Sequence, residues 1–184
     1  MKKLSRLTGI SMFAVMALLI AGCIVSGTFV VTIFIGENDF TAGTQLYFYA
    51  VDLTDEEDWE DHEEHIDNID VIGFELWINN SGGSATTFEV WVRDIMSDTL
   101  TSYAEVTNTS ANGTFQVLRD LTIQPGDNHI TYGQSLSKVI NGDRLRTAVE
   151  DGIFQYYGYS SVGQPGAAYT IDSARVIVTV SASE

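Results

Sequence analysis

The chain has 184 residues, of which 25 are acidic and 9 basic, so its formal net charge is −16 at pH 7. This length suits one domain, and 45% hydrophobic residues with only 18% charged residues are enough for a packed core. The acidity argues against binding to nucleic acid, because few basic side chains are available to displace counterions from phosphates. A single cysteine excludes an intrachain disulfide and a multi-cysteine zinc site.

The first 23 residues have the pattern of an export signal. Three of the first six residues are basic, an apolar stretch runs over residues 7–20, and Ala21 and Gly22 precede Cys23. A positive start, an apolar middle and small residues before a cleavage point are typical of a secretory signal peptide. The apolar stretch is short for a membrane-spanning helix, which needs about 20 apolar residues.

The run Leu19-Ile20-Ala21-Gly22-Cys23 resembles the lipobox of bacterial lipoprotein precursors. This resemblance covers residues 1–23 and implies a diacylglyceryl thioether on Cys23, cleavage before it, and acylation of the new amino terminus. It also implies an extracytoplasmic location. Ile24 stands where an aspartate retains enterobacterial lipoproteins at the inner membrane, which for a source with two membranes implies the outer membrane or cell surface. The alternative is an uncleaved anchor whose apolar character continues after Cys23.

Removal of residues 1–22 takes away three basic residues and no acidic one. Residues 23–184 then hold 25 acidic and 6 basic side chains, a net charge of −19, and we expect them to form one domain. The first predicted strand begins within about five residues of Cys23, so this domain should sit close to the bilayer. Anionic headgroups repel negative charge, so we expect the acidic segment 52–70 to face away from the membrane.

Alternating apolar residues dominate the rest of the chain and predict about eight strands. The predicted inward-facing sets are Phe29, Val31, Ile33 and Ile35; Leu46, Phe48 and Ala50; Ile72, Phe74, Leu76 and Ile78; Phe88, Val90 and Val92; Phe115 and Val117; Phe154 and Tyr156; and Ala174, Val176, Val178 and Val180. The Gly- and Asn-containing turn at residues 79–84 predicts a hairpin. Together these features predict an all-β fold, a two-sheet antiparallel β-sandwich of immunoglobulin-like or jelly-roll-like type.

Two short crossover helices are expected besides the strands. The first follows Thr54, whose spacing to Glu57 is that of a capping box, and continues at helical spacing through residues 59–66. The second lies within residues 141–151, and Gly152 follows at the position of a C-terminal cap. The apolar stripe of the second helix consists of Leu145, Ala148 and Val149.

The segment 52–70 holds 11 of the 25 acidic residues and no lysine or arginine. Because Ca²⁺ takes 6–8 oxygen ligands, the segment is a candidate cation site, although it lacks the spacing of an EF-hand. Its histidines are separated by two residues, whereas the metalloprotease motif has three, so zinc is weakly indicated. A solvated helix face is the favoured alternative. The candidate ligands are Asp55, Asp58, Asp61, His62 and His65.

The sequence holds no recognisable catalytic motif. There is no Gly-x-Ser-x-Gly elbow and no Walker sequence, and the only cysteine belongs to the signal. Glycoside hydrolysis by a pair of carboxylates is not excluded, because the distance between the two groups in the fold matters and not their separation in the sequence. We therefore expect a protein that is not an enzyme and has no cofactor beyond the lipid on Cys23, with Ca²⁺ as an open alternative.

Aromatic residues offer a binding hypothesis. Several fall on strand faces opposite to the apolar sets, and outward rings on a β-sandwich are able to stack sugars or contact proteins. The alternative, which we favour because large aromatics are usually buried, is that helices or loops cover these rings. The candidate rings are Trp77, Trp91, Tyr157 and Tyr159, with Tyr47 and Tyr49 assigned to the same outward set. The ranked functions are a structural or interaction lipoprotein of the envelope, a glycan-binding lipoprotein, and a divalent-cation-binding domain.

Overall fold

The computed structural model describes residues 27–34, 38–41, 46–55, 59, 66–95, 98–161 and 168–182. Its elements, in chain order, are β1 (Gly27–Phe34), β2 (Asn38–Thr41), β3 (Tyr47–Asp52), the 3-10 turn η1 (Leu53–Asp55), β4 (Ile66–Asn80), β5 (Thr86–Arg93), α3 (Tyr103–Thr107), α4 (Thr109–Asn112), β6 (Thr114–Ile123), β7 (Gly126–Ile130), α5 (Tyr132–Leu136), α6 (Gly142–Glu150), β8 (Ile153–Ser161) and β9 (Ala168–Ala182). Within these ranges, every helix is too short or too polar to cross a membrane.

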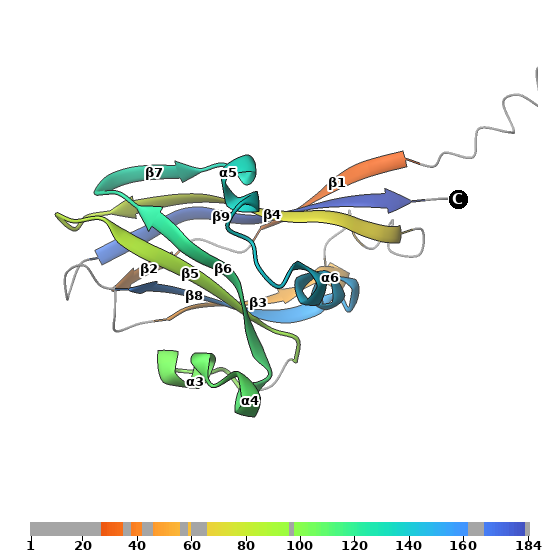
Figure 1. Ribbon diagram of the computed structural model, residues 1–184, viewed down its shortest axis with the longest axis horizontal. Helices are drawn as coiled ribbons and strands as arrows, with labels where there is room; N and C mark the ends of the chain where they lie inside the picture. Colours follow the sequence, from red (N-terminus) through yellow and green to blue (C-terminus); the bar gives the residue numbers. More distant parts are fainter. Residues whose placement is uncertain are drawn as a thin grey trace, which may run out of the picture.

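The strands form two antiparallel sheets that pack face to face (Figure 1). The first sheet has the order β1-β9-β4-β7, with β2 also paired to β9, and the second has the order β3-β8-β5-β6. From β2 onward, each strand is followed by one in the other sheet, except at β5–β6. This order is that of a jelly roll, whereas immunoglobulin sheets are ordered ABED and CFG. The predicted sandwich is confirmed, and the jelly roll is the form adopted.

The predicted hairpin across residues 79–84 is wrong. β4 pairs with β9 and β7, while β5 pairs with β6 and β8, so this turn carries the chain from one sheet to the other. The buried Asn80 holds the turn together: its side-chain amide donates to the Ser84 carbonyl at 3.0 Å, and its Oδ1 accepts from the Gly82 N–H at 2.9 Å. The local sequence predicts a tight turn, but it does not choose the partners of the strands that the turn joins.

The hydrophobic core lies between the sheets. The predicted inward-facing residues of β4, β5, β8 and β9 are all buried there, as are Phe115 and Val117 of β6. The two faces of β3 are reversed relative to the prediction. Tyr47 is 2% exposed and contacts Tyr156 edge-on at 5.9 Å between ring centroids, whereas Ala50 is exposed. A strand presents one face or the other as a whole, and the tyrosine face of β3 fills the space between the sheets better than the face with Ala50.

The second predicted helix is confirmed as α6, which lies at one end of the sandwich between the two sheets (Figure 1). Its predicted apolar stripe is fully buried, and Gly152 has a φ of +77°, as expected for a residue that ends a helix in the left-handed region. The first predicted helix does not extend to residue 66, because Ile66 is the first residue of β4. Residues 53–55 form the 3-10 turn η1, Trp59 is buried, and Glu57 lies outside the described residues.

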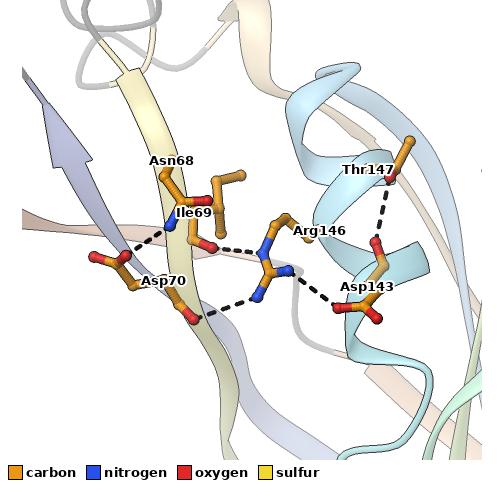
Figure 2. A network of polar contacts seen from close by, with 6 residues as sticks. All are labelled: Asn68, Ile69, Asp70, Asp143, Arg146 and Thr147. Carbon is orange, nitrogen blue, oxygen red and sulfur yellow. Dashed lines mark hydrogen bonds and ion pairs between the residues drawn. The ribbon is translucent and has the colours of Figure 1, made fainter.

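Arg146 of α6 forms hydrogen bonds with β4 at a point where the register of that strand shifts (Figure 2). The pairing of β4 with β9 shifts in register between Ile69 and Val71. Arg146 Nε donates to the Ile69 carbonyl at 2.5 Å and Nη2 donates to the Asp70 carbonyl at 3.4 Å, while Nη1 contacts Asp143 Oδ1 at 3.1 Å. A guanidinium has five N–H donors and no acceptor, so it supplies hydrogen bonds to carbonyls at this bulge.

Candidate functional site

The four aromatic residues predicted as a sugar platform are divided between the two sheets. Trp77 lies on β4 of the first sheet, whereas Trp91 lies on β5 and Tyr157 and Tyr159 lie on β8 of the second. Trp77 and Trp91 each alternate with buried residues of their strands, so each ring is on the outer face of its own sheet. The outer faces of a sandwich point in opposite directions, and the four rings therefore do not form one binding surface.

Residues 98–113, which include α3 and α4, cover the outer face of the second sheet (Figure 1). Tyr157 is fully buried beneath them, where its hydroxyl accepts from the Leu100 N–H at 3.2 Å and donates to Gln155 Oε1 at 2.9 Å. For Tyr157, the favoured alternative of a covered ring is correct, and the hypothesis of an exposed ring that stacks on a sugar is not. Strand alternation indicates which face a residue occupies, but it does not show what packs on that face.

Glu89 joins α3 to the outer face of the second sheet. Its Oε2 accepts from Trp91 Nε1 at 3.2 Å and from the Tyr103 hydroxyl at 3.1 Å. Tyr103 also stacks on Tyr159, with ring centroids 3.9 Å apart and an interplanar angle of 17°. Burial and the neighbouring Glu89 carboxylate raise the pKa of Tyr103 to about 12. Trp91 and Tyr159 thus help to hold α3 on the sheet.

A sequence signal for α3 exists and was missed. Ser102 and Glu105 have the spacing of a capping box, and both of its hydrogen bonds are present. Glu105 also accepts from the Thr101 backbone N–H at 2.8 Å. Hydrogen bonds from Thr101 and Ser102 lower the pKa of Glu105, because they stabilise its charged form. This pattern predicts where the helix starts, although it does not predict the sheet on which the helix packs.

Trp77 is the one candidate ring on the outer face of the first sheet, and it is half-buried. The register of β7 places His129 beside it, and the two rings stack at 4.5 Å with an interplanar angle of 11°. The Arg175 guanidinium, on β9, lies 5.1 Å from the Trp77 ring centroid, within the range of a cation–π interaction. His129 Nε2 is 2.8 Å from Glu75 Oε1. We call Glu75, Trp77, His129 and Arg175 the Trp77 cluster.

The Trp77 cluster combines an aromatic surface with groups that form hydrogen bonds. Sequence reasoning selected Trp77 but missed its three neighbours. Glu75 lies two positions before Trp77 on β4, whereas His129 and Arg175 follow it 52 and 98 positions later in the chain. Only the pairing of β4 with β7 and β9 brings them together.

The acidic segment returns to the first sheet close to the start of β1. Gly27 pairs with Ala182 of β9, and Ile66 pairs with Ala182 from the other side. Adjacent strands are about 4.8 Å apart, so Ile66 and Gly27 lie roughly 10 Å from each other. Residues 56–58 and 60–65 of the acidic segment lie outside the described residues, so the expectation that this segment faces away from the membrane stays a prediction.

Most of the predicted metal and lipid sites lie outside the described residues. These are Cys23, Asp58, Asp61, His62 and His65, while Asp55 is described only as the last residue of η1. Where the chain is described, no group of three or more His, Cys, Asp and Glu side chains is arranged to hold a metal ion. The cation-binding hypothesis thus stays a prediction from the sequence.

No protein-family model and no curated protein matches the chain. Solved structures of virus particles resemble it at low identity. The T13 particle of infectious bursal disease virus matches with a TM-score of 0.44 and 12% identity, over 83% of this chain and 31% of that chain. Turnip yellow mosaic virus matches with a TM-score of 0.32 and 14% identity, over 86% of this chain and 82% of that chain. The chain spans about a third of the length of the bursal virus protein, and the jelly-roll assignment depends on its own strand order.

Proposed function

We propose that this chain is the precursor of a lipid-anchored cell-envelope protein, in which residues 23–184 form the mature protein. Its jelly-roll sandwich would act as a non-catalytic structural or interaction module. One observation carries the proposal: the basic start, the apolar stretch and the lipobox-like run occur in the right order and end at Cys23. The position of β1, which begins at Gly27, supports it, because the folded domain starts directly after the proposed anchor.

The chemistry of the chain suits such an anchor. Cys23 is the only cysteine, so no other thiol competes for the lipid. Two or more acyl chains on one residue hold a protein stably in a bilayer, because each buried CH₂ contributes about 0.8 kcal/mol. Four residues span at most about 14 Å when fully extended. The domain would thus be held at the membrane surface, where it could bind neighbouring envelope proteins or polysaccharides.

Mass spectrometry of the protein expressed in a bacterium that processes lipoproteins tests this proposal. We expect a mature chain that begins at Cys23 and carries the mass of its acyl groups. Cys23→Ser should leave the precursor unacylated and uncleaved, whereas the nearby control Ser26→Ala should be processed normally. A soluble, unmodified mature chain from the unaltered sequence would refute the proposal.

The Trp77 cluster supports glycan binding as a second candidate function. Its half-buried ring lies among charged side chains on the outer face of the first sheet. If the protein binds a polysaccharide, Trp77→Ala should abolish its retention on that polysaccharide. Trp91→Phe is the matched control, because Trp91 lies on the opposite, covered face, and this variant should bind normally. No retention of the unaltered protein, or retention unchanged by Trp77→Ala, rejects this function.

A further inference from the structure

An apolar patch lies on the outer face of the first sheet, away from the Trp77 cluster. It is formed by Val30 of β1, Val71 of β4 and Leu136 of α5, which are 59%, 39% and 38% exposed. Among the described residues, only one other large hydrophobic side chain is comparably exposed. This is Ile95, which is 54% exposed and follows β5 of the second sheet.

Two residues of the apolar patch share one row of the first sheet, and the third lies over the next outward position of β4. Thr179 of β9 pairs with Val30 on one side and with Val71 on the other, so these residues form one row across three strands. Gly73 is the next position on the same face of β4, and Tyr132 and Leu136 of α5 both lie over it. A Cβ atom placed on Gly73 would be 3.1 Å from Leu136 Cδ2. The glycine therefore lets α5 approach the sheet and bring Leu136 next to the row.

Two acidic side chains of β4, Asp70 next to Val71 and Glu75 four positions after it, are engaged in polar contacts. Asp70 accepts from Ser181 Oγ at 2.6 Å and from Asn68 Nδ2 at 2.8 Å. Glu75 is paired with His129 at 2.8 Å. In a mature chain with a net charge of −19, the apolar patch is thus a region where apolar side chains, rather than free carboxylates, face solvent. Such a region is suited to contact an uncharged or zwitterionic surface.

The proposed anchor lies close to the apolar patch. Val30 comes only seven positions after Cys23, so the chain between them spans at most about 25 Å. An amphipathic surface that binds a membrane buries its apolar side chains about 5–10 Å into the boundary between headgroups and acyl chains. A lipid on Cys23 therefore keeps the apolar patch within reach of that boundary at all times, and the tether raises the effective concentration of the contact.

We propose that the apolar patch of Val30, Val71 and Leu136 rests on the lipid surface that holds Cys23. The part of the first sheet's outer face that carries the apolar patch then contacts the bilayer, and the face covered by α3 and α4 points away from it. This inference depends on the proposed function for the anchor in the cell, but the affinity of the patch for lipid is a separate property. The occupant is a phospholipid surface, rather than a second copy of the chain.

Hydroxyl-radical footprinting tests the contact. The lipidated protein, reconstituted into phosphatidylcholine vesicles, is compared with the chain from Cys23 onward, made without the signal segment and without acyl groups, free in solution. Oxidation of Val30, Val71 and Leu136 should be at least about threefold slower on vesicles, because the headgroup boundary excludes water from an inserted apolar face. Oxidation of Ile95 should not change. Equal oxidation in both states, or protection of Ile95 to the same extent, would overturn the proposal.

Two matched variants decide whether the apolar patch itself causes the protection. Val71→Glu places a charge in the patch and should restore oxidation of Leu136 on vesicles to the rate seen in solution. Ile95→Glu introduces the same charge at the exposed aliphatic residue outside the patch and should leave Leu136 protected. Protection of Leu136 that survives Val71→Glu contradicts the proposal. Protection that appears without vesicles as protein concentration rises would assign the patch to an interface between copies.

A second experiment distinguishes failure of this inference from failure of the proposed function. The chain from Cys23 onward, without acyl groups, is coupled through its only thiol to a maleimide lipid in the same vesicles. If the cell does not lipidate Cys23 but the coupled chain shows protection at Val71 and Leu136, the proposed function fails while the lipid contact stands. If the natural protein is lipidated but neither preparation shows protection, the contact fails while the anchor stands.

Discussion

The outer faces of the two sheets look alike in sequence but have different surroundings in the fold. Both carry aromatic residues that alternate with buried apolar ones. On the second sheet, the chain between β5 and β6 folds back as α3 and α4, and Tyr157 is fully buried. On the first sheet, α5 lies over Gly73, while Trp77 is half-buried and Val71 is exposed.

The difference between the two outer faces shows that the segments joining the strands determine which face of the sandwich is covered. The connection from β5 to β6 has about twenty residues and contains two short helices, which is enough to span a sheet face. β7 and α5 are joined by a single residue, so α5 stays near the point where β7 leaves the edge of β4. The outer face of the first sheet, which the described residues cover less, is therefore the one on which we place both the Trp77 cluster and the apolar patch.

The largest expected change in the free energy of unfolding comes from removing one aromatic ring from the outer face of each sheet. Tyr157→Ala should lower the free energy of unfolding by about 3–5 kcal/mol, because it leaves a cavity under residues 98–113. Trp77→Ala should cost about 1 kcal/mol, since its ring is in part exposed and its cation–π contact is at the surface. Urea denaturation of both variants measures the difference. Equal losses would mean that the two faces are equally covered.

The carboxylates of the two faces provide a second comparison. Glu89→Ala should destabilise the protein by about 1–3 kcal/mol, because it leaves the Trp91 and Tyr103 donors without an acceptor. Glu75→Ala removes a surface pair with His129, and such pairs contribute about 0–1 kcal/mol. Denaturation at neutral pH checks both values. A larger loss for Glu75 than for Glu89 would contradict the assignment of the second sheet as the covered face.

Alkaline pH should weaken the attachment of α3. The pKa of Tyr103 is about 12 in the folded protein, while an unfolded tyrosine ionises near 10. The stabilising contribution of Tyr103 is therefore complete below about pH 10 and is lost as the pH rises towards 12. Tyr103→Phe should make stability less dependent on pH in this range. Glu89→Gln should lower the pKa of Tyr103, as read by tyrosinate absorbance, and an unchanged pKa would exclude Glu89 as a cause.

The smallest effect is expected at two consecutive tyrosines of β8, which lie on opposite faces of the second sheet and should respond with opposite signs. The hydroxyl of Tyr156 is buried and has no hydrogen-bond partner among the described residues, and burial raises its pKa well above the ordinary value. Tyr156→Phe should thus be neutral or stabilising by up to about 1 kcal/mol. Tyr157→Phe loses two hydrogen bonds and should cost about 1–2 kcal/mol. A substantial loss for Tyr156→Phe would reveal a partner for its hydroxyl.

Part of the fold could be predicted from local patterns. The alternation in β4, β5, β8 and β9 identified the buried residues correctly, and the apolar stripe with a following glycine located α6. The reversed facing of β3 shows the limit of this reasoning. Both faces of that strand carry large residues, and the choice was made by the fit of Tyr47 against Tyr156 on another strand.

The candidate sites were less predictable than the fold. Trp77 was selected from the sequence, but His129 and Arg175 join it only through pairing with distant strands. The apolar patch had no sequence signal, because Val30, Val71 and Leu136 are each isolated exposed residues in their own segments. Surfaces made from several strands depend on register and neighbours, and neither is encoded in the period of a single strand.

The sequence by itself determined the acidic charge, the position of the single cysteine, the all-β class and which residues of most strands face the core. These properties follow from composition and from a local period of two residues. The tertiary structure decided the strand order of the jelly roll, the covering of the second sheet and the neighbours of Trp77 and Val71. These features depend on contacts between residues that are far apart in the chain. Only the packing of the whole domain determines which of those contacts form.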